Sequence, residues 1–462
     1  MVLTRDLINP TITFKDYHQI NNEYTYEIYT FEDLSSYIDA CKNFLVENYN
    51  ILPNQCALIG VRNASKLQLA LVFAFLELGV ALSIVDYERE DEFIDVNYVD
   101  PKTKLLLPID YHVVNSTDHT KFKIFEKLCN NTIVFDDKSL NNFTKNNTIL
   151  ATNESVVMKC TSSGTTGTPK IIQHTHEFIY NLVLRNSKFY QGSAGYIFNL
   201  NHGSSPATYF FPTLASQQIV ECINFSWMCM PSALRNEKLN HLMIPYSHQI
   251  DEILKTQNFT NENLNLYTLS TIKRHWLEYV KSKKISNIIS IFGSNETSGP
   301  VFLNYLNDNK FQENKFVKPD DFYNVDLNTE GEITVTLPTY NKSIKTNDKF
   351  KKVDNNYYHL GRSDLLRING KEINKDKYDY LIKSKLNADP IYDTVNNEIY
   401  LAVWDNVEEL DDLINELNTT LKKLSQNSHF ISKYKILTFS NFLTGVKVDH
   451  ELLRDWFRNY YT

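Results

Sequence analysis

The chain is poor in glycine, which makes up 13 of its 462 residues. That is about 3%, where about 7% is usual for proteins in general. A sequence this sparing is expected to keep glycine mainly where backbone geometry demands it, as in tight turns and close approaches to a ligand. The length and the hydrophobic content of 42% provide for a large core and at least two domains.

Several signals of other protein classes are missing. The six cysteines (41, 56, 129, 160, 222 and 229) include no Cys-x-x-Cys pair and no His/Cys metal spacing. Cys222 and Cys229 lie in an apolar segment, so we expect buried thiols there. The net charge of −8 argues against a surface that binds nucleic acid or an anionic membrane.

The N-terminus lacks the basic and apolar segments of a signal peptide, so we expect a cytoplasmic protein. The stretch 67–85 is apolar enough to raise the question of a membrane span, but Gln68, Glu77 and Gly79 interrupt it. A buried helix that runs into a strand explains it better, and we expect no membrane insertion.

What is present predicts an α/β fold. Thr30 and Asp33 make a capping box at the start of a helix, and 56–61, 65–78 and 80–85 predict a strand, a helix and a strand. This βαβ unit implies a parallel sheet. We expect a large N-terminal domain, 1–363, with mixed or parallel sheets flanked by helices.

The pattern changes after Gly361. We expect helices over 375–386 and 407–424, a hairpin of 390–395 and 398–403, and a strand over 434–440. These elements predict a small C-terminal α+β domain, 364–462.

One ten-residue segment, 161–170, combines hydroxyl side chains, two glycines and a lysine. It follows an apolar run that predicts a strand ending near Cys160. Hydroxyls and free backbone N–H groups of such a loop can surround a polyanion, and Lys170 adds a positive charge. The Walker A pattern is absent. The segment closely resembles the phosphate loop of the adenylate-forming superfamily, which includes acyl- and aryl-CoA synthetases, peptide-synthetase adenylation domains and luciferases.

This resemblance implies that the segment binds the triphosphate of ATP and that Thr165 also takes part in catalysis. The residues concerned are Thr161, Ser162, Ser163, Gly164, Thr165, Thr166, Gly167 and Lys170. Seven of the 13 glycines fall in segments that resemble motifs of this family: Gly164, Gly167, Gly293, Gly331, Gly361, Gly370 and Gly445.

Further motifs follow in the order expected for the family. Segment 292–297, Phe-Gly-Ser-Asn-Glu-Thr, resembles the YGxTE motif. The resemblance implies that Phe292 stacks on adenine, that Gly293 and Asn295 lie beside the nucleotide, and that Glu296 holds Mg²⁺. A carboxylate suits that cation, which prefers oxygen ligands.

Two more motifs concern the ribose and the region between the domains. Thr346-Asn347-Asp348 resembles the TGD motif, which implies that Asp348 accepts hydrogen bonds from the ribose hydroxyls. Segment 361–370 resembles GRxDxxIKxxG, which implies nucleotide contacts for Arg362 and Arg367 and a hinge at Asp364, about which the small domain moves.

The last motif lies near the C-terminus. Segment 444–450, Thr-Gly-Val-Lys-Val-Asp-His, resembles NGKVDR, although its glycine is displaced by one position and His450 replaces arginine. The resemblance implies that Lys447 is the catalytic lysine.

The acyl pocket is the least specified part of the site. Segment 197–205 resembles the region in which an aromatic residue or a histidine guards the pocket, which implies this catalytic and substrate-gating role for His202, beside Gly203. Ser270 and Thr271 stand where the family usually has two glycines, and Ser294 completes the predicted pocket. Segment 197–206 has no aspartate for a substrate ammonium, so a small or aromatic acid is favoured over an amino acid.

The resemblance implies ATP-dependent activation of a carboxylic acid as an acyl-adenylate, release of pyrophosphate and transfer of the acyl group to CoA. Two alternatives stay open. The acceptor can be the pantetheine of a carrier protein or an amine, or the chain can be a degenerate nucleotide-binding member, because the glycine before Lys447 is displaced and Ile171 alters the loop exit. The expected cofactors are ATP, Mg²⁺ and CoA.

Overall fold

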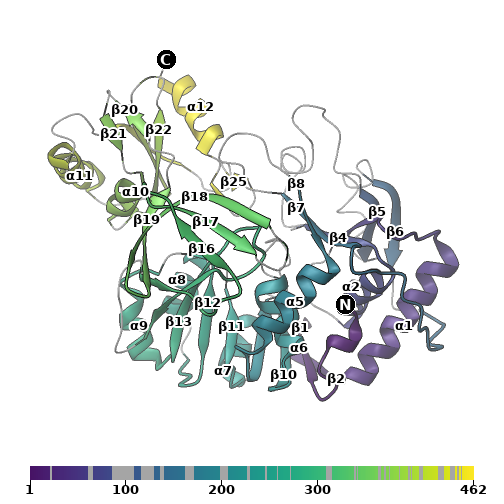
Figure 1. Ribbon diagram of the computed structural model, residues 1–462. Coiled ribbons are helices and arrows are strands. Elements are labelled where there is room, and N and C mark those ends of the chain that lie inside the picture. Colours follow the sequence, from purple (N-terminus) through teal and green to yellow (C-terminus); the bar gives the residue numbers. More distant parts are fainter. Residues whose placement is uncertain are drawn as a thin grey trace. The chain divides into compact units, whose positions relative to one another are not determined.

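The chain forms two compact units, Met1–Pro319 and Asp320–Thr462, shown in the computed structural model of Figure 1. The predicted domain boundary at 363/364 lies outside the described residues. It stays a prediction of the point about which the small domain rotates. The structure describes residues 1–20, 23–60, 66–85, 109–115, 129–135, 140–161, 171–197, 206–225, 229–244, 247–256, 259–270, 272–307, 315–337, 340, 342–362, 366–368, 371–373, 375–383, 385–393, 396, 398–404, 409–424, 431–437, 443–444, 447–448 and 450–461.

The first sheet of the N-terminal unit has the strand order β6-β5-β3-β4-β7-β8. The predicted βαβ unit is confirmed, because β3 and β4 pair in parallel on either side of helix α2. Only β8 runs antiparallel, to β7. The strands are β3 (Cys56–Gly60), β4 (Ala81–Val85), β5 (Ile109–Asn115), β6 (Cys129–Phe135), β7 (Val156–Thr161) and β8 (Ile171–Thr175).

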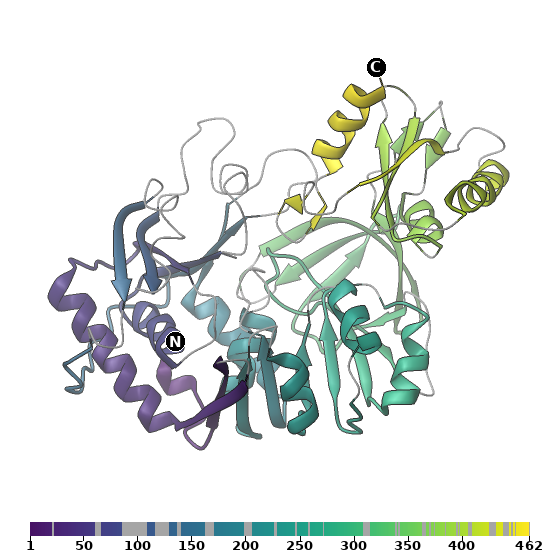
Figure 2. The same ribbon diagram turned by 180° about the vertical axis from the view of Figure 1, so that it is seen from behind.

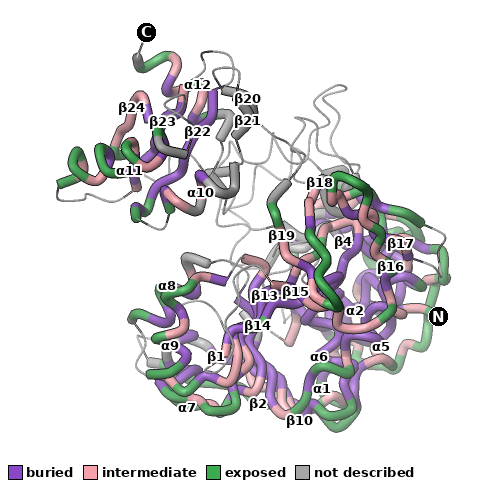
Figure 3. Tube along the Cα trace, turned by 60° about the vertical axis from the view of Figure 1, so that its left-hand side comes forward, coloured by how far each residue is buried: buried purple, intermediate pink, exposed green. Residues whose placement is uncertain are grey.

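Two helices of this region form for different reasons. Helix α1 (Phe31–Asn48) begins at the predicted capping box, where the Asp33 N–H donates to Thr30 Oγ1 and the Thr30 N–H donates to the Asp33 carboxylate. Helix α2 (Lys66–Glu77) is buried along nearly its whole length, as Figure 3 shows. None of the helices in the described ranges is both long enough and apolar enough to cross a lipid bilayer.

A second sheet of the N-terminal unit has the order β15-β14-β13-β12-β11-β9-β10-β1-β2. From β13 to β1 every neighbouring pair is parallel, so the carboxyl ends of these strands share one edge, where open α/β sheets usually bind ligands. The strands are β1 (Thr13–Ile20), β2 (Glu23–Thr30), β9 (Gly192–Ile197), β10 (Ile219–Phe225), β11 (His241–Met243), β12 (Asn265–Thr268), β13 (Asn287–Phe292), β14 (Phe302–Leu306) and β15 (Lys315–Val317).

Helices cover these sheets with apolar side chains. Helix α5 contacts β7, β8, the π-turn η4 and α6, and the view from behind in Figure 2 shows the helices that line the second sheet. Cys222 and Cys229 are buried thiols that form no disulfide in the described part of the chain, as predicted. The remaining helical elements of this unit are η1 (Arg5–Leu7), α5 (His176–Ser187), η4 (Pro206–Phe210), α6 (Phe211–Ala215), α7 (Met230–Asn236), α8 (Ser247–Thr256) and α9 (Trp276–Lys283).

Within its described residues, the C-terminal unit is built from three helices and from strands that pair antiparallel except for one parallel pair. Its β-strands are β16 (Asn324–Leu327), β17 (Glu332–Leu337), β18 (Lys342–Val353), β19 (Asn356–Arg362), β20 (Leu366–Ile368), β21 (Lys371–Ile373), β22 (Ala388–Asp393), β23 (Glu398–Val403), β24 (Ile431–Ile436), β25 (Leu443–Thr444) and β26 (Lys447–Val448). The helices are α10 (Lys375–Lys383), α11 (Leu410–Leu424) and α12 (His450–Tyr461).

The predicted elements of this unit are present with shifted ends. The hairpin is confirmed as β22 and β23, which pair antiparallel. Helix α11 begins at Leu410 and not at 407, because Glu409 has a φ of 59° and a left-handed residue cannot continue an α-helix. The last long strand is β24, which starts three residues before the predicted 434 because it pairs in parallel with β23 from Ile431 onward.

Candidate active site

The predicted phosphate loop is bracketed by two paired strands. Thr161, the last residue of β7, lies opposite Ile171, the first residue of β8. The two ends of the segment 162–170 are therefore neighbours in the sheet. The segment itself lies outside the described residues, with Ser162, Ser163, Gly164, Thr165, Thr166, Gly167 and Lys170, and so do His202, Gly203, Thr271 and Asp364.

The predicted metal-binding motif forms a tight turn directly after β13. The Ser294 N–H donates to Thr297 Oγ1 at 2.9 Å, and the Thr297 hydroxyl and N–H donate to the Ser294 carbonyl at 3.0 and 3.1 Å. Gly293 makes the turn possible, since a Cβ at this position would lie 2.4 Å from the carbonyl oxygen of Gly299. The Ser294 side chain, predicted to line the pocket, also accepts a bond from the Thr297 N–H at 3.3 Å.

Glu296 lies at the tip of this turn and is partly exposed. Its carboxylate makes no hydrogen bond and no ion pair with any residue in the described part of the chain. Both oxygens are therefore available to a hard cation, and the residue fits a Mg²⁺ ligand. Phe292, which precedes the turn, is half-buried, with ring centroids 5.8 Å from Phe302 and 6.0 Å from Phe316.

Three neighbouring elements hold the end of the turn. Ser298 is fully buried and has a φ of 51°, a backbone conformation that costs a non-glycine residue about 1–3 kcal/mol and persists only when the surroundings enforce it. Thr208 of η4 donates to the Ser298 carbonyl at 3.4 Å, and Arg185 of α5 donates to the Pro300 carbonyl at 3.0 Å. The third contact comes from His174 of β8, whose Nε2 lies 2.7 Å from the Asn295 carbonyl oxygen. Sequence reasoning missed these residues, because no local pattern marks them.

The predicted pocket wall is small and polar. Ser270 follows β12, its N–H donates to Thr268 Oγ1 at 3.1 Å, and its carbonyl accepts from the Ser290 hydroxyl at 2.8 Å. Thr268 and Ser290 are opposite each other in adjacent parallel strands, and both are buried. These two residues were not predicted, although each lies close to a motif residue.

Buried aromatic rings fill the space next to this wall. Tyr190, Tyr209 and Tyr267 have ring centroids 5.3 to 5.7 Å apart. His241 Nδ1 lies 3.1 Å from the Tyr267 hydroxyl, and its Nε2 accepts from the Gln191 N–H at 3.1 Å. Burial lowers the pKa of His241 from 6.5 to about 4, so this histidine is neutral at physiological pH and belongs to a packed interior.

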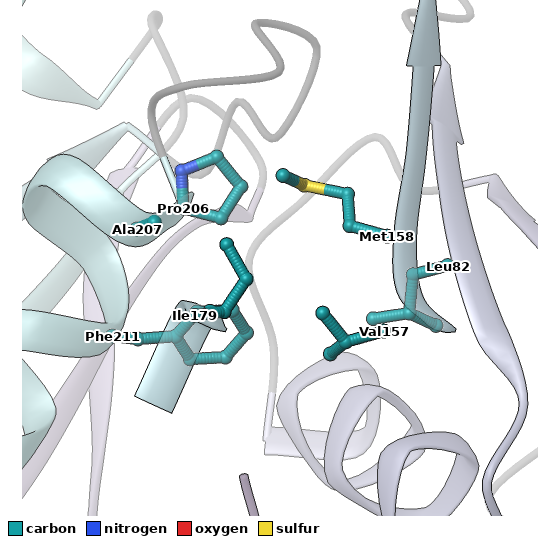
Figure 4. A pocket seen from close by; sticks show the side chains of 7 residues that line it. All are labelled: Leu82, Val157, Met158, Ile179, Pro206, Ala207 and Phe211. Carbon is teal, nitrogen blue, oxygen red and sulfur yellow. The ribbon is translucent and has the colours of Figure 1, made fainter. Parts of the chain in front are cut away.

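A small apolar pocket lies between the first sheet and the helical elements α5, η4 and α6 (Figure 4). Leu82, Val157 and Met158 face it from β4 and β7. The opposite wall is made of Ile179, Pro206, Ala207 and Phe211. All seven side chains are apolar, so the pocket has no side-chain donor for a carboxylate or a phosphate and cannot be the anion site.

The C-terminal unit holds a second group of predicted residues. Asp348 of β18 lies opposite Arg362 of β19 in the antiparallel ladder, so the two segments predicted to contact the nucleotide are cross-strand neighbours. The Asp348 carboxylate lies 3.1 Å from His359 Nε2, a partner that the sequence did not reveal. Lys447 of β26 pairs with Thr444 of β25, and Arg367 of β20 pairs with Glu372 of β21.

A family model for AMP-binding enzymes matches residues 13–317. That range is about two thirds of the chain and includes both the phosphate-loop segment and the turn of Glu296. The chain belongs to the AMP-binding enzyme family. Membership indicates an adenylating ligase that uses ATP and confirms the resemblance to adenylate-forming enzymes.

Solved structures of this superfamily share the fold at low sequence identity. The A-PCP structure of McyG with phenylalanyl-adenylate is 13% identical, with a TM-score of 0.76, over 100% of this chain and 96% of that chain. O-succinylbenzoate coenzyme A synthetase (MenE) from Bacillus subtilis, in complex with ATP and magnesium ion, is 16% identical, with a TM-score of 0.70, over 96% and 97%.

A benzoate CoA ligase from Burkholderia xenovorans LB400 is 13% identical, with a TM-score of 0.71, over 92% of this chain and 94% of that chain. A search of curated protein sequences gave no match.

Proposed function

We propose that this AMP-binding enzyme joins a small or aromatic carboxylic acid to AMP and then transfers the acyl group to the thiol of CoA. The observation that carries the proposal is the turn after β13. At the carboxyl edge of the parallel strands, this turn presents the Glu296 carboxylate, which has no partner among the described residues. The likeness in fold to a benzoate CoA ligase and to a succinylbenzoate CoA synthetase supports it.

In the first step a carboxylate oxygen of the acid attacks the α-phosphorus of ATP. A bond forms between that oxygen and phosphorus, the bond to the bridging oxygen breaks, and pyrophosphate leaves with the electron pair. Two anions must approach each other, so charge neutralisation governs the barrier. When bound at Glu296, Mg²⁺ would neutralise phosphate oxygens.

The chain's own residues divide the remaining work. The segment 161–170 would enclose the phosphates with N–H groups and hydroxyls, and Asp348 would accept hydrogen bonds from the ribose hydroxyls. The Lys447 ammonium would contact both the carboxylate and the α-phosphate during the first step. In the second step the CoA thiolate attacks the acyl carbon and AMP leaves, after a rotation of the small domain about Asp364.

The small-acid part of the proposal rests on the pocket wall. Ser270 and Thr271 carry side chains where a pair of glycines would leave room, and the nearby rings of Tyr190, Tyr209 and Tyr267 are packed against one another. Packed walls tolerate little added volume, so acids longer than about eight carbons should be excluded. Efficient activation of palmitate would refute this part alone.

The test is a panel of carboxylic acids scored by pyrophosphate release, with and without CoA. We expect Glu296→Gln to lose Mg²⁺-dependent release while its unfolding temperature stays that of the wild type. Lys447→Ala should slow adenylation by roughly 10²–10³, or about 3–4 kcal/mol, because one preorganised charge contact is lost. It should still convert a supplied acyl-adenylate to the thioester.

Each result has a defined opposite. Near-normal turnover of Glu296→Gln overturns the metal role, and an equal loss of both half-reactions in Lys447→Ala overturns the lysine assignment. Transfer only to the pantetheine of a carrier protein or to an amine replaces CoA as the acceptor. Absence of pyrophosphate release with every acid would leave a degenerate, nucleotide-binding member of the family.

A further inference from the structure

His174 links the two segments to which the proposed function assigns ATP and its metal. It lies in β8, which begins directly after the phosphate-loop segment 162–170. Its Nε2 lies 2.7 Å from the carbonyl oxygen of Asn295 and 2.7 Å from Oγ of Ser298. Asn295 is the residue immediately before Glu296 in the metal-binding turn.

The hydrogen-bond chemistry fixes the protonation of this imidazole. A carbonyl oxygen can only accept, so Nε2 must carry the proton that is donated to Asn295. The Ser298 hydroxyl also donates to the Asn295 carbonyl, at 3.2 Å. The Asn295 carbonyl therefore accepts two hydrogen bonds, one from His174 and one from Ser298. The His174 N–H lies within hydrogen-bond distance of both Asn295 and Ser298.

The imidazole itself is held in place. His174 is 2% exposed, and its ring stacks on Phe178 of α5 at a centroid distance of 5.1 Å and an angle of 24°. The His174 imidazole, held in place on β8, thus fixes a turn whose backbone is strained at Ser298. A displacement of the turn would leave the buried Nε2–H without its acceptor, which is costly.

We propose that His174 is a positioning residue for the metal-binding turn. By donating to the Asn295 carbonyl, it sets where the Glu296 carboxylate stands relative to β8. The inference rests on the proposed function, because it requires Glu296 to bind the metal that accompanies ATP. Loss of a residue that orients a metal ligand typically weakens metal binding by roughly 10- to 100-fold.

The experiment compares His174→Gln with His174→Met in the full-length chain. Both side chains are unbranched and similar in size, but only glutamine keeps an N–H donor near the position of Nε2. Binding of Mn²⁺·ATP is measured by electron paramagnetic resonance, and binding of ATP alone is measured in EDTA by calorimetry. Neither measurement depends on turnover.

We expect His174→Met to bind Mn²⁺·ATP roughly tenfold more weakly than the wild type. His174→Gln should remain within about threefold of the wild type, because it keeps the hydrogen bond. Binding of ATP in EDTA should be the same in all three proteins. A merely structural role would weaken both kinds of binding, and the donor-keeping variant would not restore either.

His176 provides a matched control. It is buried two residues further on, but its Nδ1 accepts from the Leu3 N–H at 3.1 Å, and it makes no hydrogen bond to the turn among the described residues. His176→Gln should lower the unfolding temperature and leave Mn²⁺·ATP binding unchanged.

The inference is overturned if His174→Met binds Mn²⁺·ATP like the wild type, or if both substitutions weaken it equally. Should His174→Met not fold, His174→Asn, whose shorter amide cannot reach the Asn295 carbonyl, must weaken Mn²⁺·ATP binding severalfold, and an unchanged affinity overturns the inference. A wild-type protein that binds ATP equally well with and without the metal would overturn the metal role of Glu296, and this inference with it.

Discussion

Four charged residues form a buried ion cluster in the N-terminal unit, and removing the charge of Glu77 should destabilise it strongly. Glu77 Oε1 accepts from the backbone N–H and Nε of Arg5 at 3.0 and 2.8 Å, and Oε2 accepts from Arg5 and Lys42, each at 2.8 Å. Arg5 also donates to Asp39 at 2.7 Å. The side chains of Lys42 and Glu77 are 0% and 2% exposed.

The size of the effect follows from the charges. Two cations and two anions balance in the wild type, whereas Glu77→Gln leaves one buried positive charge in excess. An unpaired buried charge lowers the free energy of unfolding by about 3–5 kcal/mol. With about 2.1 cal/mol/K per residue, a unit the size of Met1–Pro319 has an unfolding entropy of about 0.7 kcal/mol/K. We therefore expect the transition of this unit to fall by about 4–8 °C in a calorimetric scan.

A second substitution tests the reasoning. Lys42→Met in the Glu77→Gln background restores the charge balance and leaves Arg5 paired with Asp39. The double variant should therefore melt at a higher temperature than the sum of the two single effects implies. If the changes in melting temperature of the two single variants simply add up in the double variant, the cluster stabilises the unit by packing and not by charge balance. That result would refute the argument.

The pH dependence of this effect has a definite sign. Burial alone would raise the pKa of Glu77, but Arg5 and Lys42 reverse this and hold it below its ordinary value of 4.5. A lowered pKa adds stability above the unfolded value and loses it as the pH falls through the folded value. The difference in melting temperature between the wild type and Glu77→Gln should therefore shrink below about pH 4.

Two further predictions concern other acidic residues. Burial raises the pKa of Asp16 from 3.8 to about 6, so the folded state binds this proton more tightly. The free energy of unfolding of the wild type should fall by about 3 kcal/mol between about pH 4 and pH 6. In Asp16→Asn, urea unfolding should show no such fall with pH. An unchanged pH dependence in this variant would contradict the raised pKa of Asp16. His359→Leu, which removes the partner of Asp348, should raise KM for ATP by roughly tenfold. Lys351 is exposed and lies on β18 together with Asp348, and Lys351→Ala should leave KM for ATP unchanged.

The sequence was most informative where a residue acts through its near neighbours. The capping box of Thr30 and Asp33 spans only four residues and determines where α1 begins. Apolar periodicity locates β3, α2 and β4. The hairpin of β22 and β23 is equally local. The ends of α11 and β24 were misplaced because they depend on the backbone of Glu409 and on pairing with β23, which no local pattern contains.

The site shows the same division. Its motifs could be proposed one by one, because each is a short run of residues to which the family resemblance assigns one chemical task. Their joint geometry was not predictable: the spacing of Asp348 and Arg362 makes sense only once β18 and β19 are seen to pair. His359 and Thr268 were missed for the same reason, since each matters only through a partner on another strand or turn.

The turn of Glu296, to which the proposed function assigns the metal, shows why such partners matter for the chemistry. Glu296 has the required carboxylate, but a five-residue turn with a left-handed Ser298 is not stable by itself. Its position comes from His174, Thr208 and Arg185, which lie on β8, η4 and α5 and reach the turn through 2.7 to 3.4 Å contacts. Because β8 also closes the phosphate-loop segment, the same strand positions both groups that the proposed function places on ATP. Substitutions in these anchors should therefore disturb metal use before they disturb folding.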